Sequence, residues 1–291
     1  LAASNALVDK NRERLKKELI PVRPGNRKPL YFHAKTSALE ADWITANMRA
    51  LHEGEEGVSY SSMGVLYRAH YVSRALEESL IRNKIPYVLY SGVEFYKRKE
   101  IKDVLSYLRM IYNPDDISFL RTVNEPRRGV GRTRIASIKA YAAARGCTLY
   151  QALMDNLETD SFRRCKAKDY VRLIEKYRAI FDQMDLTDLL AGILHESGYE
   201  QMLRTAGEEE RLDNLAELKQ AISDFTRKAG ETVTLGNYLD HAALFTNMDT
   251  GERAQAVKLM TVHSAKGLEF PVVFVCGLSE GIFPGKRANT R

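Results

Sequence analysis

The chain has 291 residues, of which 44% are hydrophobic and 28% are charged. These proportions are typical of a soluble globular protein with a sizeable core and exclude a disordered chain. The sequence has no apolar run long enough to cross a bilayer and no secretory signal, so we expect no membrane partner. The excess of 44 Lys and Arg over 38 Asp and Glu permits binding to a polyanion without proving it.

The cysteines and the two ends of the chain indicate its setting. Cys147, Cys165 and Cys276 have neither the spacing of a metal site nor that of a disulfide framework, which indicates a reducing cytoplasm. Residues 1–17 have a helical pattern with no N-cap residue before it, and the sequence stops in a basic loop after a strand pattern. We therefore expect a piece of a longer protein.

The first third of the chain alternates between short apolar runs and helical patterns. Strands are expected at 30–34, 63–69 and 85–92, and helices at 38–54 and 71–84 between them. Alternation of this kind predicts βαβ units, and therefore a parallel sheet.

The strand signal then disappears as far as residue 246. Segments with 3.6-residue apolar spacing follow one another at 100–113, 134–146, 168–184, 186–203, 210–225 and 235–245. Runs rich in β-branched residues return at 256–263 and 271–278, as is typical of a sheet buried on both faces. The fold class predicted is α/β, with the sheet domain in two pieces and an all-helical domain inserted between them.

Polar side chains follow the strand expected at 256–263, in the segment TVHSAKGLEF (261–270). Ligands of open parallel sheets gather at the carboxyl ends of the strands. The hydroxyl, imidazole, ammonium and carboxylate groups around Gly267 fit a nucleotide or phosphate, but a solvated turn capped by Thr261 explains them equally well. The pattern contains no metal-ligand spacing and no catalytic triad.

The segment EPRRGVGRTRI combines a Gly-x-Gly turn, Gly129 to Gly131, with the start of a helix. Backbone N–H groups at such a helix start attract phosphate. The arginines around the turn are Arg127, Arg128, Arg132 and Arg134. We therefore expect this turn to contact the backbone of duplex DNA, although the glycines also suit an ordinary turn.

Four segments resemble the UvrD/Rep (PcrA-like) family of superfamily 1 DNA helicases. LMTVHSAKGLEFPVVFVCGLSEGIFP (259–284) resembles the motif V region, and GVLYRAHYVSRALEESL (64–80) resembles the motif IV region. GVEFYKRKEIKDVLSYLRMIYNPDD (92–116) resembles the segment that opens the helical 2B insertion, and NEPRRGVG (124–131) resembles the glycine turn within it. Their order and spacing agree with the family over essentially the whole chain.

The resemblance implies an ATP-driven translocase, in which RecA-like domains 1A and 2A clamp ATP and Mg²⁺ between them and 1B and 2B are insertions. The expected division is 2A at 1–95, 2B at 96–250 and the rest of 2A at 251–291, truncated before motif VI. By the same resemblance, Gly267 and Glu269 face the nucleotide. Arg68, Thr261 and His263 are expected on single-stranded DNA, and Arg127, Gly129, Gly131, Arg132 and Thr133 on duplex DNA.

Two residues and one basic run in these segments have explanations other than DNA contact. The family commonly has Asn where this chain has His70, which weakens the case for a contact there. An ion pair of Arg74 with Glu77 or Glu78 explains that arginine at least as well as DNA does. The basic run Lys97 to Lys99 is expected to form a solvated helix start.

The chain has no GxxxxGK[ST] motif, so we do not expect it to bind or hydrolyse ATP alone. The function predicted is that of a fragment of a bacterial, cytoplasmic, ATP-dependent 3′ to 5′ helicase acting in repair or replication restart. The partners implied are a DNA junction, the 1A and 1B domains, and repair or replication proteins. Two alternatives stay open: a non-catalytic DNA-binding or interaction module, and the helicase subunit of a helicase–nuclease.

Overall fold

The structure is a computed structural model that describes residues 28–55, 57–90, 92–229, 233–247 and 253–284, together with Asn5, Ala6, Asp9 and Ile20. The chain divides into two compact units, residues 1–34 and 35–291, and all the elements below belong to the second. The helix expected at 1–17 lies almost entirely outside the described residues.

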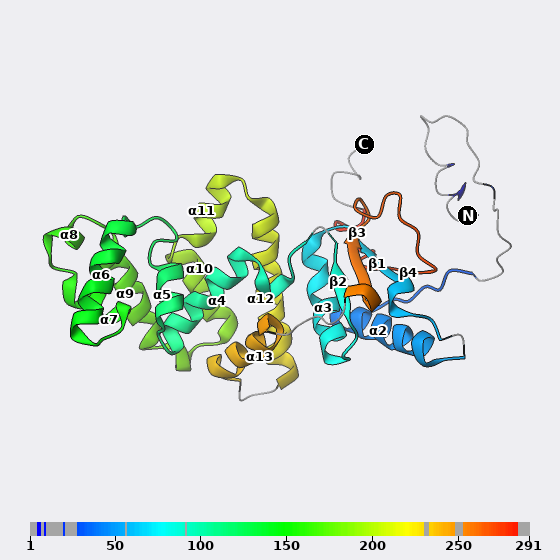
Figure 1. Ribbon diagram of the computed structural model, residues 1–291, viewed down its shortest axis with the longest axis horizontal. Coiled ribbons are helices and arrows are strands. Elements are labelled where there is room, and N and C mark those ends of the chain that lie inside the picture. The colour runs from blue at the N-terminus through cyan, green and yellow to red at the C-terminus, as the bar shows by residue number, and fades with distance from the viewer. Residues whose placement is uncertain are drawn as a thin grey trace. The chain divides into compact units, whose positions relative to one another are not determined.

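Four parallel strands form one sheet in the order β2-β3-β1-β4 (Figure 1). Their bounds are β1 Met63–Tyr67, β2 Tyr87–Leu89, β3 Val257–Thr261 and β4 Val272–Val275. The expected parallel sheet is thus confirmed, with strands shorter than the apolar runs that predicted them. β3 lies between β1 and β2, so the distant carboxyl-terminal segment completes a sheet begun near the amino terminus.

Helices α2 (Ser37–Glu53) and α3 (Ser73–Arg82) cover one face of this sheet. Ile44 and Met48 of α2 and Leu80 of α3 share a buried cluster with Val65 and with Leu259 of β3. Side chains alternate between the two faces along a strand. Val273 and Val275 of β4 therefore point to the other face, where they are 46% and 44% exposed. The expectation of a sheet buried on both faces is wrong for β4, because no described helix packs over those side chains.

Between β2 and β3, every described regular element is a helix. The 3-10 segment η3 (Phe95–Lys97) comes first, followed by α4 (Lys99–Tyr112), α5 (Asp116–Thr122), α6 (Arg132–Arg145), α7 (Leu149–Asn156), α8 (Asp160–Arg163), α9 (Ala167–Arg178), η4 (Phe181–Gln183), α10 (Leu186–Glu196), α11 (Tyr199–Ala206), α12 (Glu209–Ala229) and α13 (Leu235–Asn247). These helices bury their own hydrophobic cluster, separate from that of the sheet, around Tyr107, Phe119 and Tyr170. The helices between β2 and β3 therefore form a second hydrophobic core.

The helix pattern differs from the expected one in its details. The helix expected at 186–203 is two helices, because Gly198 between them has φ +76° and ends the first. The short helices α5 and α7 were not expected. Each begins at a capping residue, Asp115 or Thr148, whose side chain accepts a backbone N–H of the first turn.

The strand expected at 30–34 is wrong. These residues have no regular structure, and the side chains of Leu30 and Tyr31 are 82% and 81% exposed. A strand requires a hydrogen-bonded neighbour, and no described residue pairs with this segment. An apolar run alone was therefore not enough to form a strand.

Buried charges join α3 to the helical block. Arg74 of α3 forms ion pairs with Glu78 at 3.0 Å, Glu217 at 2.5 Å and Asp224 at 3.4 Å, and only 3% of its side chain is exposed. Burial alone would lower the pKa of Arg74, but the carboxylates of Glu78 and Glu217 raise it above the ordinary value. The expected Arg74–Glu78 pair is confirmed, Glu77 is not a partner, and two further partners come from α12.

Arg98 forms a second buried link. It donates to Asn214 Oδ1 at 2.7 Å and to the carbonyl of His70 at 3.0 Å. The expected solvated helix start is wrong for this residue, because its guanidinium is buried against acceptors that lie far away in sequence. Sequence position alone could not distinguish it from Lys97 and Lys99 beside it.

Glu77 of α3 is buried and accepts hydrogen bonds from Ser73 Oγ at 2.5 Å and from the backbone N–H of Phe95 at 2.9 Å. Burial raises the pKa of Glu77 to about 7, although both hydrogen bonds act to lower it. A folded-state pKa above the unfolded value means that the native state holds the proton more tightly. The resulting stabilisation is complete below about pH 4.5 and is lost as the pH rises through 7.

We therefore expect Glu77→Gln to remove a pH-dependent loss of stability of about 3 kcal/mol between pH 4.5 and 8. Urea unfolding of the wild type and the variant across this range measures the difference. Glu53→Gln, which alters an exposed carboxylate of α2, is the control and should leave the pH profile unchanged. Parallel profiles for wild type and Glu77→Gln would show that Glu77 does not titrate in this range.

Candidate nucleic-acid and nucleotide sites

The first candidate site lies where β1 and β3 end side by side. Tyr67 is in register with Thr261, and the N–H of Val262 donates to the carbonyl of Tyr67 at 2.8 Å. Arg68 follows Tyr67 directly and is exposed. Two segments that are far apart in the sequence thus place Arg68 beside the loop that starts at Thr261.

The loop after Thr261 is held by Thr261 itself. Its hydroxyl lies 2.9 Å from Ser264 Oγ and accepts the N–H of Ser264 at 3.2 Å, so this threonine does cap the turn. Gly267 has φ +88°, a backbone conformation that favours glycine. The side chains of His263, Lys266 and Glu269 are exposed, and none has an ion-pair partner among the described residues.

The segment after Arg68 folds inward. The His70 ring is partly buried at an edge-on angle to Tyr67, and its buried Nδ1 atom has no hydrogen-bond partner among the residues that the structure describes. Burial lowers the pKa of His70 by more than the Glu210 carboxylate raises it, and Arg98 acts in the same direction as burial, which favours the neutral ring. A neutral, partly buried ring is a poor phosphate ligand, which agrees with the weak case for His70 in the sequence.

The second candidate site is the Gly-x-Gly turn before α6. Asn124 Oδ1 accepts the N–H groups of Arg128 and Val130, each at 3.0 Å, and so holds the turn closed. Gly129 has φ +79°, and a Cβ atom there would lie only 3.0 Å from the Cβ of Cys165. The turn therefore requires glycine for both its backbone angle and its close packing.

Gly131 is the N-cap of α6, and no side chain caps this helix. Among the described residues, no acceptor receives the backbone N–H of Arg132, Thr133 or Arg134. Unpaired N–H groups at the positive end of a helix form an anion-binding surface. A pocket of about 430 Å³ lies in front of them.

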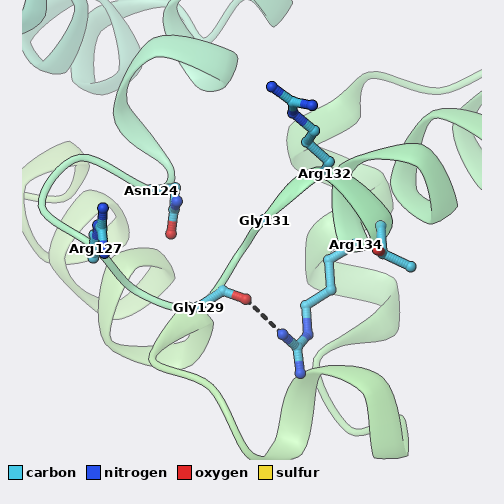
Figure 2. A pocket seen from close by; sticks show the side chains of 7 residues that line it. Asn124, Arg127, Gly129, Gly131, Arg132 and Arg134 are labelled. Carbon is cyan, nitrogen blue, oxygen red and sulfur yellow. Dashed lines mark hydrogen bonds between the residues drawn. The ribbon is translucent and has the colours of Figure 1, made fainter.

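The pocket is shown in Figure 2. Its lining residues are Asn124, Arg127, Gly129, Gly131, Arg132, Thr133 and Arg134. Arg127 and Arg132 are exposed and have no partner among the described residues. Arg134 instead folds back, donating to the carbonyl of Gly129 at 2.6 Å and to that of Ser161 at 2.5 Å.

Arg128 points away from the pocket into the helical core. It donates to Tyr107 Oη at 2.8 Å and to the carbonyls of Thr122 and Ser197, and it lies over the rings of Tyr107 and Tyr170. The expectation that all four arginines surround the turn is therefore wrong for Arg128, and Arg134 braces the turn. The role of Asn124 was not foreseen, because its spacing to the turn carries no recognisable pattern.

Neither candidate site is a metal centre within the described part of the chain, where no group of three His, Cys, Asp or Glu side chains could hold an ion. The described helices also include none that is both long and apolar enough to cross a bilayer.

The structure combines a parallel sheet that carries a glycine-containing loop at its strand ends with a helical block that carries a Gly-x-Gly turn before α6. The family model for the UvrD-like helicase C-terminal domain matches residues 1–291, and the chain belongs to this family. The resemblance carried by the four motifs is thus confirmed.

Named relatives agree with this assignment. The chain is 35% identical to the ATP-dependent DNA helicase PcrA of Staphylococcus epidermidis over 297 residues, and 36% identical to the PcrA of Bacillus subtilis over 301 residues. Each alignment covers 99% of this chain. The chain spans 40% of the length of these curated relatives, so they contain regions that have no counterpart here.

Proposed function

We propose that the chain is the 2A and 2B portion of an ATP-dependent 3′ to 5′ DNA helicase. The observation that carries the proposal is the match to the UvrD-like C-terminal family over the whole chain, together with relatives that are named ATP-dependent DNA helicases. These relatives do not favour a non-catalytic module. ATP and Mg²⁺ would serve the whole helicase, as would the 1A and 1B domains and partners in repair or replication in the bacterial cytoplasm.

The division into subdomains is part of this proposal. Residues 1–95 and 251–291 would be 2A, and residues 96–250 would be the 2B insertion. Support comes from the two separate hydrophobic clusters and from the path of the chain, which leaves the sheet after β2 and returns to it in β3.

The loop after β3 would serve both nucleotide and DNA. The exposed Glu269 carboxylate is an acceptor suited to a ribose hydroxyl, and Gly267 permits close approach of the backbone. Arg68 follows β1, and His263 follows the neighbouring strand β3. Both side chains would contact single-stranded DNA, and Thr261 would support the loop that carries His263. One short loop would thus couple a change at ATP to movement of the DNA backbone.

The Gly-x-Gly turn would hold the backbone of the duplex. Gly129 and Gly131 shape the turn, and the N–H groups of Arg132 and Thr133 would meet one phosphate. The guanidinium groups of Arg127 and Arg132, which have no partner in the described part of the chain, add positive charge at the same pocket. Such contacts position the duplex without reading its sequence.

Gly131→Asp tests this part of the proposal without disturbing the helix. Gly131 has φ −81°, and a Cβ atom at this position would meet open space. Asp is a favourable N-cap, so α6 should be retained or stabilised by about 0.3 kcal/mol relative to Gly. Its carboxylate would occupy the free N–H groups and repel phosphate. We expect affinity for a duplex with a 3′ single-strand tail to fall by roughly 10-fold or more, measured by fluorescence anisotropy over a salt series.

Lys139→Gln is the matched control, because it changes the net charge by the same one unit at an exposed site on the same helix. A small, salt-sensitive loss of affinity is expected for it. If both variants lose the same affinity, the turn contributes only through the net charge of the protein. If Gly131→Asp binds DNA as the wild type does, the turn is not part of the DNA interface.

A further inference from the structure

Tyr90, the residue directly after β2, has an exposed aromatic ring at the carboxyl edge of the sheet. Its backbone N–H donates to the carbonyl of Leu259 at 2.9 Å, so it lies beside β3 just before Thr261. The side chain is 41% exposed. Among the described residues, neither the ring nor the phenol hydroxyl has a stacking, cation–π or hydrogen-bond partner.

The strand order places Tyr90 in line with the single-strand site. Across the carboxyl edge, β2 is followed by β3 and then by β1, so Tyr90, the loop after Thr261 and Arg68 succeed one another. Neighbouring strands lie about 4.8 Å apart, and the register places Arg68 two residues further along the strand direction than Tyr90, so about 12 Å separates their backbones. That distance corresponds to about three to four stacked nucleotides at about 3.4 Å each.

A second contact places the segment after β2 near Arg68. A Cβ atom on Gly92 would lie 3.3 Å from Nδ1 of His70, two residues beyond Arg68. The alternation along β2 directs Tyr87 and Leu89 toward the cluster under α2 and α3, and Tyr90 away from it. Tyr90 is thus excluded from the core by its register and lies at the same edge as Arg68.

We propose that Tyr90 is a base-stacking residue of the single-strand DNA track formed by Arg68 and His263; this inference rests on the proposed function. An exposed aromatic ring by itself is ordinary. Tyr90 differs because two side chains that suit phosphates, His263 after β3 and Arg68 after β1, lie at the same edge of the sheet, and because no stacking, cation–π or hydrogen-bond contact among the described residues uses its ring. Aromatic platforms beside a basic groove bind single strands of any sequence, since every base offers a flat face.

The test separates stacking from phosphate contact by changing the DNA as well as the protein. The 291-residue chain is titrated by fluorescence anisotropy against labelled oligo-dT and against an oligonucleotide of equal length in which abasic sites replace the bases. We expect Tyr90→Ala to weaken binding to oligo-dT by roughly 5- to 100-fold and to leave abasic binding unchanged. Tyr90→Phe keeps the ring and should bind as the wild type does.

Two further variants make the outcomes distinguishable. Arg68→Ala should weaken binding to both oligonucleotides, because it removes a phosphate contact. Tyr112→Ala removes another exposed tyrosine, one that already contacts the Phe181 ring, and should change neither affinity. Circular dichroism of each variant verifies that the fold is retained.

If Arg68→Ala weakens binding while Tyr90→Ala matches the wild type, the stacking role is overturned and the track stands. Equal losses for Tyr90→Ala on oligo-dT and abasic DNA would also overturn stacking, since the bases would then play no part. If the wild type fails to bind single strands, or neither variant has an effect, both the track and the role of Tyr90 are wrong.

Discussion

Arg74→Ala is expected to lower the free energy of unfolding by roughly 3–5 kcal/mol, because it would leave buried carboxylates without their cation. Three acidic side chains converge on this guanidinium, two of them from α12: Glu78, Glu217 and Asp224. Burial already raises the pKa of Glu217 despite the presence of Arg74. Equilibrium unfolding in urea at pH 7 measures the loss.

Arg82→Ala is the matched control on the same helix. The ion pair of Arg82 with Asp42 is short, at 2.6 Å, but both side chains are 45% exposed. Water screens such a pair and solvates the partner left behind, so we expect a loss of less than about 1 kcal/mol. Similar losses for the two variants would show that Arg74 is not the charge that holds α12 against α3.

Arg128→Met is expected to destabilise the chain by roughly 3–6 kcal/mol and to abolish the contribution of the Gly-x-Gly turn to duplex binding. The methionine would fill much of the volume of the arginine stem but would remove the donor that Arg128 supplies to the carbonyl of Ser197 and one of the donors to the carbonyl of Thr122. It would also remove the cation lying over Tyr107 and Tyr170. Thermal unfolding and duplex titration of the same sample measure both effects.

Arg127→Met is the neighbouring control, with the opposite pattern expected. Arg127 is exposed, lines the pocket and has no partner among the described residues, so its loss should alter stability by less than about 0.5 kcal/mol. Duplex affinity should still fall, with a shallower dependence on salt, because one phosphate contact is lost. A stability loss at Arg127 comparable to that at Arg128 would contradict the division between a binding arginine and a structural one.

These two adjacent arginines show where sequence reasoning reaches its limit. Both belong to the same basic cluster, and no local pattern distinguishes them. Arg128 is buried because acceptors from Thr122 and Ser197, together with two tyrosine rings, surround its guanidinium. The pair Arg74 and Arg98 shows the same dependence, since their partners on α12 lie more than a hundred residues away.

Strand prediction succeeded or failed for a related reason. The apolar runs at β1 and β3 became strands because each found a parallel neighbour, with Tyr67 in register with Thr261. The comparable run at 30–34 has no such neighbour among the described residues and remained irregular. Local composition indicates that a segment can form a strand, and pairing decides whether it does.

The sequence by itself determined the helicase family, the parallel α/β class and the helical block, because motif spacing and apolar periodicity are local properties of the chain. It also located the two turns, since Gly129 and Gly267 have positive φ where glycine was required. Only the tertiary structure decided which arginines are exposed rather than buried in ion pairs and hydrogen bonds. It also decided that the Tyr90 ring is exposed at the sheet edge and that Arg68 lies beside the loop after Thr261. Those features depend on burial and on strand order, which bring together residues that are distant in the chain.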